Sequence, residues 1–521
     1  SALAASSARV VARTPVLAEL ARKEQDLDRQ LVAQLGLLNG LLAQPAAERD
    51  DKVLGTLRSE IDKLRKARDA AKRDLAGRFK NYADLVEPQP ATVEEIRKVL
   101  VDDEAFVSFY FGRNASFVWA VSKSGVVGFK PLNLTAADLE TKVAKLRAPF
   151  TSSVIEPFDV ALAHSLYAEI LQPVEHVWKS SKSLTVVANG ALGMLPLGLL
   201  PTAPSDVQWQ PEADRYAGYR TVPWLIRTHA VTMVPSGSSL RTLRQLPPAS
   251  AKREPLIGFG DPYFNQQQAD DAHKAIEVAH ATEAETTLRS LKTRRRAVRS
   301  GDDVTLSDLD RLPDTGEELE AIAKALSIDP AKALRLGKDA NEKTIKSMDL
   351  TRYRFVVFAT HGLVPPQLGL SQPAIALTAP KVANVDGDGL LTMEEVLGLK
   401  LDADWVVLSA CNTGAGAVEG AEAVSGLGRA FFYAGTRALL LTNWEVDSLS
   451  ARDLVKGTFA ILATDAKISR AEALRRSVLE LMDGPGLVRA DGTVVRTYAH
   501  PYFWAAYSIV GDGATVSAAP Q

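Results

Sequence analysis

"WVVLSACNTG", residues 405–414, joins a run of β-branched and apolar residues to a cysteine and a turn of small residues. A similar stretch, "FVVFATHG", occupies residues 355–362 and ends in His361 and Gly362. Neither run alternates polar with apolar residues, which is typical of parallel strands that helices cover on both faces. Together with the helical patterns between such runs, the two stretches predict an α/β sandwich with a mostly parallel central sheet flanked by helices.

Each of the two stretches delivers a reactive side chain just past the end of a predicted strand. In an open parallel sheet the ligand crevice lies at the carboxyl ends of the strands, so neighbouring strands would bring His361 and Cys411 face to face. A thiol is mostly protonated at neutral pH and needs a base beside it to act as a nucleophile, and histidine suits that role. No Asp or Glu is identifiable as a partner that orients His361, so we expect a backbone carbonyl to hold it. The backbone N–H groups of Gly362 and Cys411 are candidates for an oxyanion hole.

Composition limits the classes of function. The chain has 521 residues, 46% of them hydrophobic and 24% charged, with a net charge of −2 and a single cysteine. One cysteine excludes an internal disulfide framework and a multi-cysteine metal site. Without a catalytic role, Cys411 would simply be a small buried hydrophobic residue. The balanced charge favours neither a nucleic acid nor an anionic membrane as a direct partner. No apolar run is long enough to span a bilayer, so we expect a soluble, cytoplasmic protein.

The chain is long enough for about two or three domains. Residues 1–85 carry leucines at helical spacing with a polar break near "AQPAAERDD", which predicts a coiled-coil-like helical hairpin. Residues 86–250 and 251–521 each mix strands with helices and are predicted to be separate α/β domains. Within the second, residues 265–304 are polar and are expected to form a mobile insertion.

The first α/β region opens with a strong local signal. Thr92 followed by Glu95 predicts a helix start with a capping box. Residues 105–112, 116–122 and 126–132 are then rich in β-branched and aromatic residues with turns between them, and predict three strands.

One stretch imitates a calcium site. "NVDGDGLLTMEE", residues 384–395, has nearly the ligand spacing of an EF-hand loop. Its first ligand is Asn384 rather than Asp, and the preceding residues are strand-like where an entering helix is required. We therefore expect no metal and no cofactor.

Several motifs occur together and in order. They are "NGALGMLPLGLL", "VVFATHG", "GLLTMEEV", "VVLSACNTG", "GLGRAFFYAG", "LTNWEVD" and "HPYFWAAYSIVG". This series resembles the CHAT domain peptidases of bacteria, a caspase-like (clan CD) family of cysteine peptidases related to separase. The separation of 50 residues between His361 and Cys411 is similar to the caspase interval.

The resemblance implies a caspase-like fold that is duplicated. Residues 86–250 would be an inactive pseudo-caspase domain, and residues 251–521 the active CHAT domain. Asn189 and Ser236, which follow the apolar runs of residues 86–250, would stand where His361 and Cys411 stand in the active copy.

The resemblance also implies an activity. The chain would be a cysteine endopeptidase that cleaves a specific protein partner through a Cys411–His361 dyad. Family members resemble regulated proteases of bacterial stress and antiphage defence, with gasdermin activation as an example, and are often joined to upstream tetratricopeptide repeats or controlled by an activating partner protein. Two alternatives stay open: an inert scaffold or binding module with a vestigial dyad, and a cysteine-dependent acyltransferase.

A specificity pocket is the last expectation from the family. "LTNWEVD" resembles a region that in separase supplies the acid for a substrate arginine, so Trp444 and Asp447, with Glu445 beside them, would receive Arg or Lys on the amino side of the cleaved bond. The bland alternative is that Asp447 caps a helix and Trp444 packs in the core. If the basic preference holds, "KTRRRAVRS" in the insertion becomes a candidate self-cleavage site.

Overall fold

The computed structural model describes residues 27, 30, 31, 34 and 38, and then residues 51–78, 90–152, 154–207, 216–281, 305–365, 367–370, 372–409, 426–465, 467–489 and 491–514. The chain divides into two compact units. One is formed by Ser1–Pro90 with Gln245–Pro247, and the other by Ala91–Arg244 with Pro248–Gln521.

The first unit is helical, as its leucine spacing predicts. Helix α3 spans Asp51–Arg78, and the five described positions before it are also helical. Leu31 from the earlier helix packs against Leu57 and Ile61 of α3, and all three are buried. Residues spaced by three or four share one face of a helix, which explains why these leucines meet in one seam.

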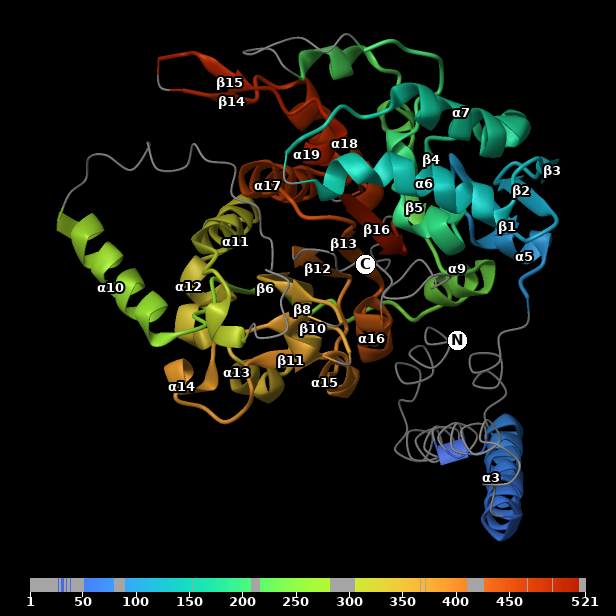
Figure 1. Cartoon of the computed structure of the whole chain (residues 1–521), viewed down its shortest axis with the longest axis horizontal. Helices are drawn as coiled ribbons and strands as arrows, with labels where there is room; N and C mark the ends of the chain where they lie inside the picture. The colour runs from blue at the N-terminus through green and yellow to red at the C-terminus, as the bar shows by residue number, and fades with distance from the viewer. Residues whose placement is uncertain are drawn as a thin grey trace. The chain divides into compact units, whose positions relative to one another are not determined.

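The second unit is built on one large sheet (Figure 1). Its strands lie in the order β3-β2-β1-β4-β5-β16-β13-β12-β8-β6-β7. Their bounds are β1 Glu104–Phe111, β2 Ser116–Ser122, β3 Val127–Leu132, β4 Ser183–Val187, β5 Ala230–Met233, β6 Glu254–Gly260, β7 Leu334–Leu336, β8 Tyr353–Ala359, β12 Trp405–Ser409, β13 Ala438–Thr442 and β16 Tyr507–Gly511. Of the ten neighbouring pairs, seven are parallel, which confirms the predicted mostly parallel sheet.

Two smaller sheets accompany it. Strands β9 (Gly362–Leu363), β10 (Ala374–Ala376) and β11 (Leu390–Thr392) form one, and β14 (Leu487–Val488) with β15 (Val494–Arg496) forms the other.

Helices cover both faces of the large sheet. Phe355 of β8 contacts Phe459, which lies on α17, whereas Phe358 of the same strand contacts Phe431 on α16. Residues three apart in a strand point to opposite faces, so α16 and α17 lie on opposite sides of the sheet (Figure 1). The helices of this unit are α5 Val93–Val99, α6 Ala136–Thr151, α7 Val160–Ile170, α8 Glu175–Trp178, α9 Gly237–Arg244, α10 Gln266–Ala281, α11 Pro313–Ala325, α12 Pro330–Ala333, α13 Glu342–Ser347, α14 Pro380–Ala383, α15 Met393–Gly398, α16 Gly426–Ala434, α17 Ser448–Thr464, α18 Arg470–Asp483 and α19 Pro501–Trp504. In the part of the chain that the structure describes, no helix has both the length and the apolar character that crossing a membrane requires.

The two predicted α/β domains share this sheet. Strand β5 from residues 86–250 pairs directly with β16 from residues 251–521, with Thr232 opposite Ile509. Both regions belong to one compact unit, so the expected boundary near residue 250 does not separate two bodies. The reason is that β16, the last strand in the sequence, inserts between β5 and β13.

The proposed duplication stays a prediction, with one observation in its favour. Strands β4 and β5 are adjacent and parallel, as β8 and β12 are, and they precede Asn189 and Ser236. Because β16 is antiparallel to β13, the two strand pairs run in opposite directions. Strands β4 and β5 therefore point in the opposite direction to β8. Asn189 and Ser236, which follow them, lie beyond the other ends of the strands from His361.

The predicted mobile insertion needs a correction. Its first part is helix α10, and Ala269 and Ala272 of that helix are buried against Tyr263 and Val382. Residues 282–304, which include "KTRRRAVRS", lie outside the described residues.

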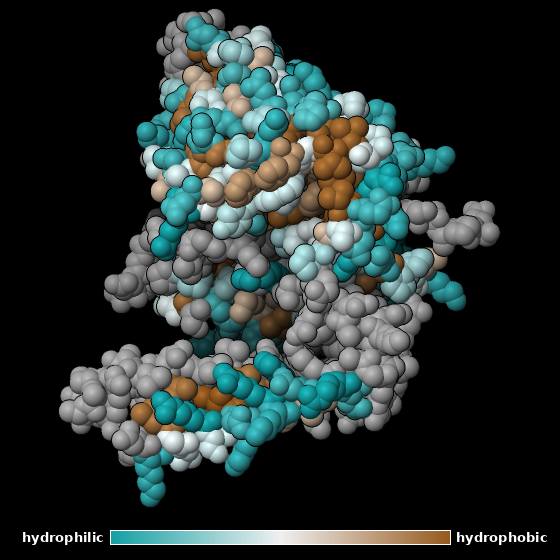
Figure 2. Space-filling model, turned by 90° about the vertical axis from the view of Figure 1, so that its right-hand side faces the viewer, coloured by the Kyte–Doolittle hydropathy of each residue, from teal (hydrophilic) through white to brown (hydrophobic). Residues whose placement is uncertain are grey.

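The β3 end of the large sheet carries an exposed aromatic face. Tyr110, Trp119 and Phe129 are 53%, 37% and 50% exposed. Figure 2 shows apolar surface on the side of the molecule that carries these strands. The rings of Phe117 and Trp119 lie 5.6 Å and 5.3 Å from that of Phe129, so the aromatic side chains partly shield one another.

Candidate active site

The register of two strands sets the geometry of the candidate site. In the parallel pair β8 and β12, Ala359 lies opposite Ser409. His361 follows Ala359 by two residues, and Cys411 follows Ser409 by two residues. The strands that lead to the two predicted catalytic residues are thus direct neighbours, as expected. Residues 410–425, including Cys411, lie outside the described residues, so the contact between the thiol and His361 stays a prediction.

The side chain of His361 is buried and held by a backbone carbonyl. It is 1% exposed, and its Nε2 lies 2.8 Å from the carbonyl oxygen of Asp310. A carbonyl oxygen can only accept, so Nε2 carries the proton and Nδ1 is the nitrogen with the basic lone pair. The ring of Phe264 packs at 5.5 Å on the imidazole. The expected contact of a backbone carbonyl with His361 is therefore present in the structure.

The backbone around His361 is also fixed. Its carbonyl accepts the N–H of Ala376 at 2.9 Å, and the hydroxyl of Thr360 donates to the carbonyl of Ala376 at 2.9 Å. Gly362 lies opposite Ile375 in the antiparallel pair of β9 and β10. Because Ala376 donates to His361, these two residues form a hydrogen-bonded pair, and the neighbouring pair of Gly362 and Ile375 is a non-hydrogen-bonded one. The N–H of Gly362 therefore faces away from β10. The oxyanion role of this N–H stays a prediction, because Cys411 lies outside the described residues.

Sequence reasoning could not find Asp310 or Phe264. A backbone carbonyl acts independently of its side chain, so no residue type marks it. Phe264 is one apolar residue among many, and only the packing of the loop after β6 brings it to His361.

The residues of the predicted specificity pocket have other roles in the structure. Trp444 is 1% exposed, stacks on Phe150 with ring centroids 4.1 Å apart, and donates from Nε1 to the carbonyl of Tyr502 at 3.3 Å. Glu445 is half-buried. Trp444 is therefore core packing, as the alternative interpretation had it.

Asp447 caps helix α17. Its Oδ1 accepts the N–H of Ser450 at 3.1 Å, and its Oδ2 lies 2.7 Å from the Nη2 of Arg496. The residue is 1% exposed. A substrate arginine would thus meet a carboxylate that already has a guanidinium partner, and this corrects the expectation of an open acidic pocket at Asp447.

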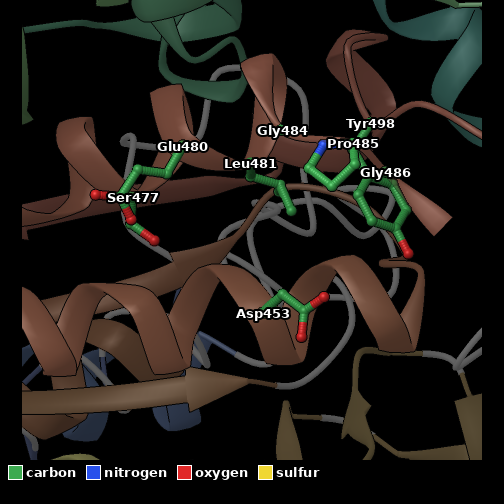
Figure 3. Close-up of a pocket in the computed structure, with 8 residues that line it drawn as sticks. All are labelled: Asp453, Ser477, Glu480, Leu481, Gly484, Pro485, Gly486 and Tyr498. Carbon is green, nitrogen blue, oxygen red and sulfur yellow. The ribbon is translucent and has the colours of Figure 1, made fainter. Parts of the chain in front are cut away.

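A cavity lies elsewhere on the unit (Figure 3). Its volume is about 240 Å³, and Asp453 of α17 faces Ser477, Glu480 and Leu481 of α18 across it. Its other lining residues are Gly484, Pro485, Gly486 and Tyr498. None of the predicted site residues lines this cavity.

In the calcium-like loop, residues 384–395, Glu395 has a structural role. Glu395, its twelfth position, accepts the N–H of Thr392 at 2.9 Å in a capping box for α15 and pairs with Lys346 at 2.5 Å. Within the described segments, no group of three or more His, Cys, Asp or Glu side chains is arranged to hold a metal ion.

Comparisons with known proteins place the chain in a family. No curated protein sequence matches it. Among solved structures, separase in the Saccharomyces cerevisiae separase–securin complex is similar with a TM-score of 0.41 and 11% identity, over 93% of this chain and 37% of the separase chain. The pro- and mature domains of RgpB from Porphyromonas gingivalis are similar with a TM-score of 0.36 and 11% identity, over 73% of this chain and 77% of the other. The chain thus spans well under half of the separase chain that it matches.

The family model gives the decisive match. The model of the CHAT domain matches residues 160–512, which is well over half of the chain and contains both predicted catalytic residues. This confirms the resemblance to CHAT domain proteins that the ordered motifs indicated, and the chain belongs to the CHAT domain family.

Proposed function

We propose that the chain is a cysteine endopeptidase in which Cys411 is the nucleophile and His361 the general base. The observation that carries this proposal is the pairing of Ala359 with Ser409, which brings the strand before His361 beside the strand before Cys411. The contact of Nε2 with the carbonyl of Asp310 supports it, since it leaves Nδ1 of His361 as the basic nitrogen.

The chemistry follows from these groups. Nδ1 of His361 takes the proton of the Cys411 thiol, and the thiolate attacks the carbonyl carbon of the scissile peptide bond. The N–H groups of Gly362 and Cys411 stabilise the oxyanion of the tetrahedral intermediate. His361 then gives its proton to the leaving amine, and water hydrolyses the thioester with His361 again acting as base.

Two substitutions test the proposal. Cys411→Ala should abolish cleavage of a peptide library, and His361→Ala should lower turnover by about 10²–10⁴-fold, because general base catalysis contributes that much. Both variants should keep the melting curve of the wild type. Undiminished turnover by folded Cys411→Ala would rule out the peptidase mechanism.

Two further assays separate the alternatives. An inert scaffold should not react with an electrophilic cysteine probe at neutral pH, because a thiol without a base stays protonated. An acyltransferase should transfer the acyl group to an added amine, whereas the proposed peptidase should release a free carboxylate.

We also propose a preference for Arg or Lys on the amino side of the cleaved bond. Glu445, which is half-buried, and Asp447 both follow the carboxyl end of β13, the strand next to β12. Because Asp447 is buried and pairs with Arg496, Glu445 rather than Asp447 is the acid that would receive the substrate cation. A positional-scanning peptide library tests this: a preference for acidic or aliphatic residues would refute it. With a basic preference, mass spectrometry of the incubated enzyme should detect cleavage within "KTRRRAVRS".

Membership of the CHAT domain family supports a proposal for the biological setting. We propose a regulated cytoplasmic protease that acts on one specific protein partner, in bacterial stress or antiphage defence, with a gasdermin as an example of such a partner. An upstream tetratricopeptide region or an activating protein would control it. Co-expression with candidate partners encoded nearby, comparing wild type with Cys411→Ala, tests this setting.

A further inference from the structure

The carbonyl that holds His361 belongs to a short segment just before α11. This segment, residues 305–312, begins with a capped 3-10 turn and ends where Pro313 starts the helix. Asp310 itself is exposed, and among its neighbours Leu309 is buried in the cluster of Phe264 and Leu363. The position of one backbone oxygen therefore depends on what fixes the whole segment.

Arg311, the residue after Asp310, forms a bidentate ion pair with Asp261. Nε of Arg311 donates to Oδ1 of Asp261 at 2.8 Å, and Nη2 donates to Oδ2 at 2.6 Å. The guanidinium also lies 4.9 Å from the centre of the Tyr263 ring. The two side chains are 22% and 12% exposed, so solvent screens the pair only weakly. A bidentate arginine–carboxylate pair fixes orientation as well as distance.

Asp261 is itself fixed to the strand beside β8. It follows Gly260, the last residue of β6, which lies opposite Ala359 of β8. Its backbone has a φ of +48°, in the left-handed region that non-glycine residues seldom adopt, and its N–H donates to the hydroxyl of Thr315 at 2.8 Å. Such a conformation persists only where the surroundings hold it.

Two amides support the same segment, one from the loop after β6 and one from the first turn of α10. Nε2 of Gln268 donates to the carbonyl of Leu309 at 2.7 Å, and Nδ2 of Asn265 donates to the carbonyl of Ser307 at 2.9 Å. The carbonyl of Ser307 is thus bound by the loop after β6 and that of Leu309 by α10, while the carbonyl of Asp310 contacts His361.

We propose that Asp261 and Arg311 are positioning residues that act on His361 through the carbonyl of Asp310. The inference rests on the proposed Cys411–His361 dyad. The pair connects the end of β6 to the segment before α11 and so keeps the Asp310 oxygen in reach of Nε2. Without it, Nε2–H loses a fixed acceptor and Nδ1 is no longer aimed at the thiol.

The single cysteine allows a direct test without a substrate. The rate of alkylation by iodoacetamide between pH 5 and pH 9 reports how much of Cys411 is thiolate, because the thiolate is the nucleophile. Wild type should react readily at pH 6.5, and His361→Ala should react only as the pH approaches the ordinary range of a free thiol, about 8.5. Arg311→Ala and Asp261→Asn should each lower the rate at pH 6.5 by about tenfold, which is the lower end of the loss that removal of an orienting contact causes at histidines that bind metals.

Further variants distinguish positioning from a general structural role. Arg311→Lys keeps the charge but lacks the planar fork, so its rate should fall between those of wild type and Arg311→Ala. The double variant Asp261→Asn with Arg311→Ala should lose no more than either single variant, because the two residues act as one unit. In peptide cleavage, kcat should fall while KM stays close to that of wild type, since substrate contacts are unchanged.

Arg352→Ala is the matched control. Arg352 pairs with Glu254 at 2.6 Å, at the opposite end of β6, where the two side chains are 63% and 48% exposed. This variant should keep the wild-type alkylation profile.

The outcomes separate the two proposals. If His361→Ala changes the profile but folded Arg311→Ala and Arg311→Lys match wild type, the positioning role is wrong and the dyad stands. If wild type and His361→Ala react alike at every pH, the dyad itself is absent and there is nothing for the pair to position. Where Arg311→Ala fails to fold, Arg311→Lys and Asp261→Asn decide the question.

Discussion

Asp447 shows how one side chain at the start of a helix can serve two partners. One carboxylate oxygen caps α17 and the other pairs with Arg496, whose guanidinium also lies 5.2 Å from the ring centre of Phe503. Arg496 and Asp447 side chains are only 12% and 1% exposed. Removing one member of such a pair leaves the other charge buried without its counter-charge.

The first prediction concerns the stability of Asp447 variants. Asp447→Ala should lower the free energy of unfolding by about 1 kcal/mol for the lost cap, and by a further amount of roughly 3–5 kcal/mol for the buried arginine that loses its counter-charge. Asp447→Asn keeps a cap acceptor and should cost less. Adding Arg496→Met to Asp447→Ala should restore part of the loss. Urea unfolding measures all three.

Asp159 provides the control for this comparison. It caps α7 by accepting the N–H of Leu162 at 2.8 Å and is exposed. Asp159→Ala should therefore cost only about 1 kcal/mol. An equal cost for Asp447→Ala would mean that the pair with Arg496 contributes nothing.

At the scale of elements, β16 connects the two halves of the large sheet. Ile509 lies opposite Leu440 of β13 on one side and opposite Thr232 of β5 on the other. Nearby, Arg244 of α9 pairs with Glu104 at 2.5 Å and with Asp512, just after β16, at 3.3 Å. Strand β16 is buried along its whole length, so removing β5 would expose apolar residues and an open strand edge.

The second prediction compares two fragments. A fragment that starts at Ala91 should be soluble and folded, because Ala91–Arg244 and Pro248–Gln521 form one compact unit. A fragment that starts at Lys252 should aggregate or unfold, since it lacks β1 to β5 and α9. Size-exclusion chromatography and circular dichroism measure both. A soluble and fully active fragment from Lys252 would contradict the shared sheet.

At the scale of the whole molecule, buried histidines make stability depend on pH. His500 is fully buried, accepts the N–H of Tyr502 at Nδ1 as the cap of α19, and packs edge-on against Tyr219. His500 thus has a structural role as the cap of α19. Burial lowers the pKa of His500 to about 3, and burial also lowers the pKa of His229.

The third prediction follows from the sign of these shifts. Unfolded histidine has a pKa near 6.5, so between about pH 6.5 and pH 3 the unfolded chain binds protons that native His500 does not. The contribution of each such histidine to the free energy of unfolding should be fully present above pH 6.5. It should fall as the pH is lowered, by up to about 1.4 kcal/mol per pH unit. Urea midpoints at pH 7, 6 and 5 measure this.

His500→Asn isolates the contribution of His500. Asparagine keeps a cap acceptor but has no charge to gain, so the variant should lose less stability between pH 7 and pH 5 than wild type does. Carboxylates titrate alike in both proteins and cancel in the difference. Equal slopes for the two proteins would exclude His500 as a source of acid sensitivity.

The sequence by itself determined those features that depend on residues close together in the chain, such as helix caps and individual strands. The capping box of Thr92 and Glu95 starts α5 as predicted, and the strands predicted at residues 105–112 and 116–122 match β1 and β2 within one residue. The apolar runs before His361 and Cys411 form adjacent parallel strands, and the ordered motifs identified the family. Side-chain type and spacing within a few residues control caps, strand propensity and the burial of one face.

Only the tertiary structure decided which distant groups meet. The insertion of β16 between β5 and β13, which merged two predicted domains into one sheet, follows from pairing between segments far apart in sequence. The same holds for the Asp310 carbonyl on His361 and for Arg496 on Asp447, partners that lie 51 and 49 residues away. A backbone oxygen has no signature in the sequence, and a carboxylate that can cap a helix or receive a substrate looks the same until its neighbours are known. Such contacts depend on how the whole chain packs, because long-range pairing is selected by the burial and hydrogen bonding of the complete fold rather than by local preference.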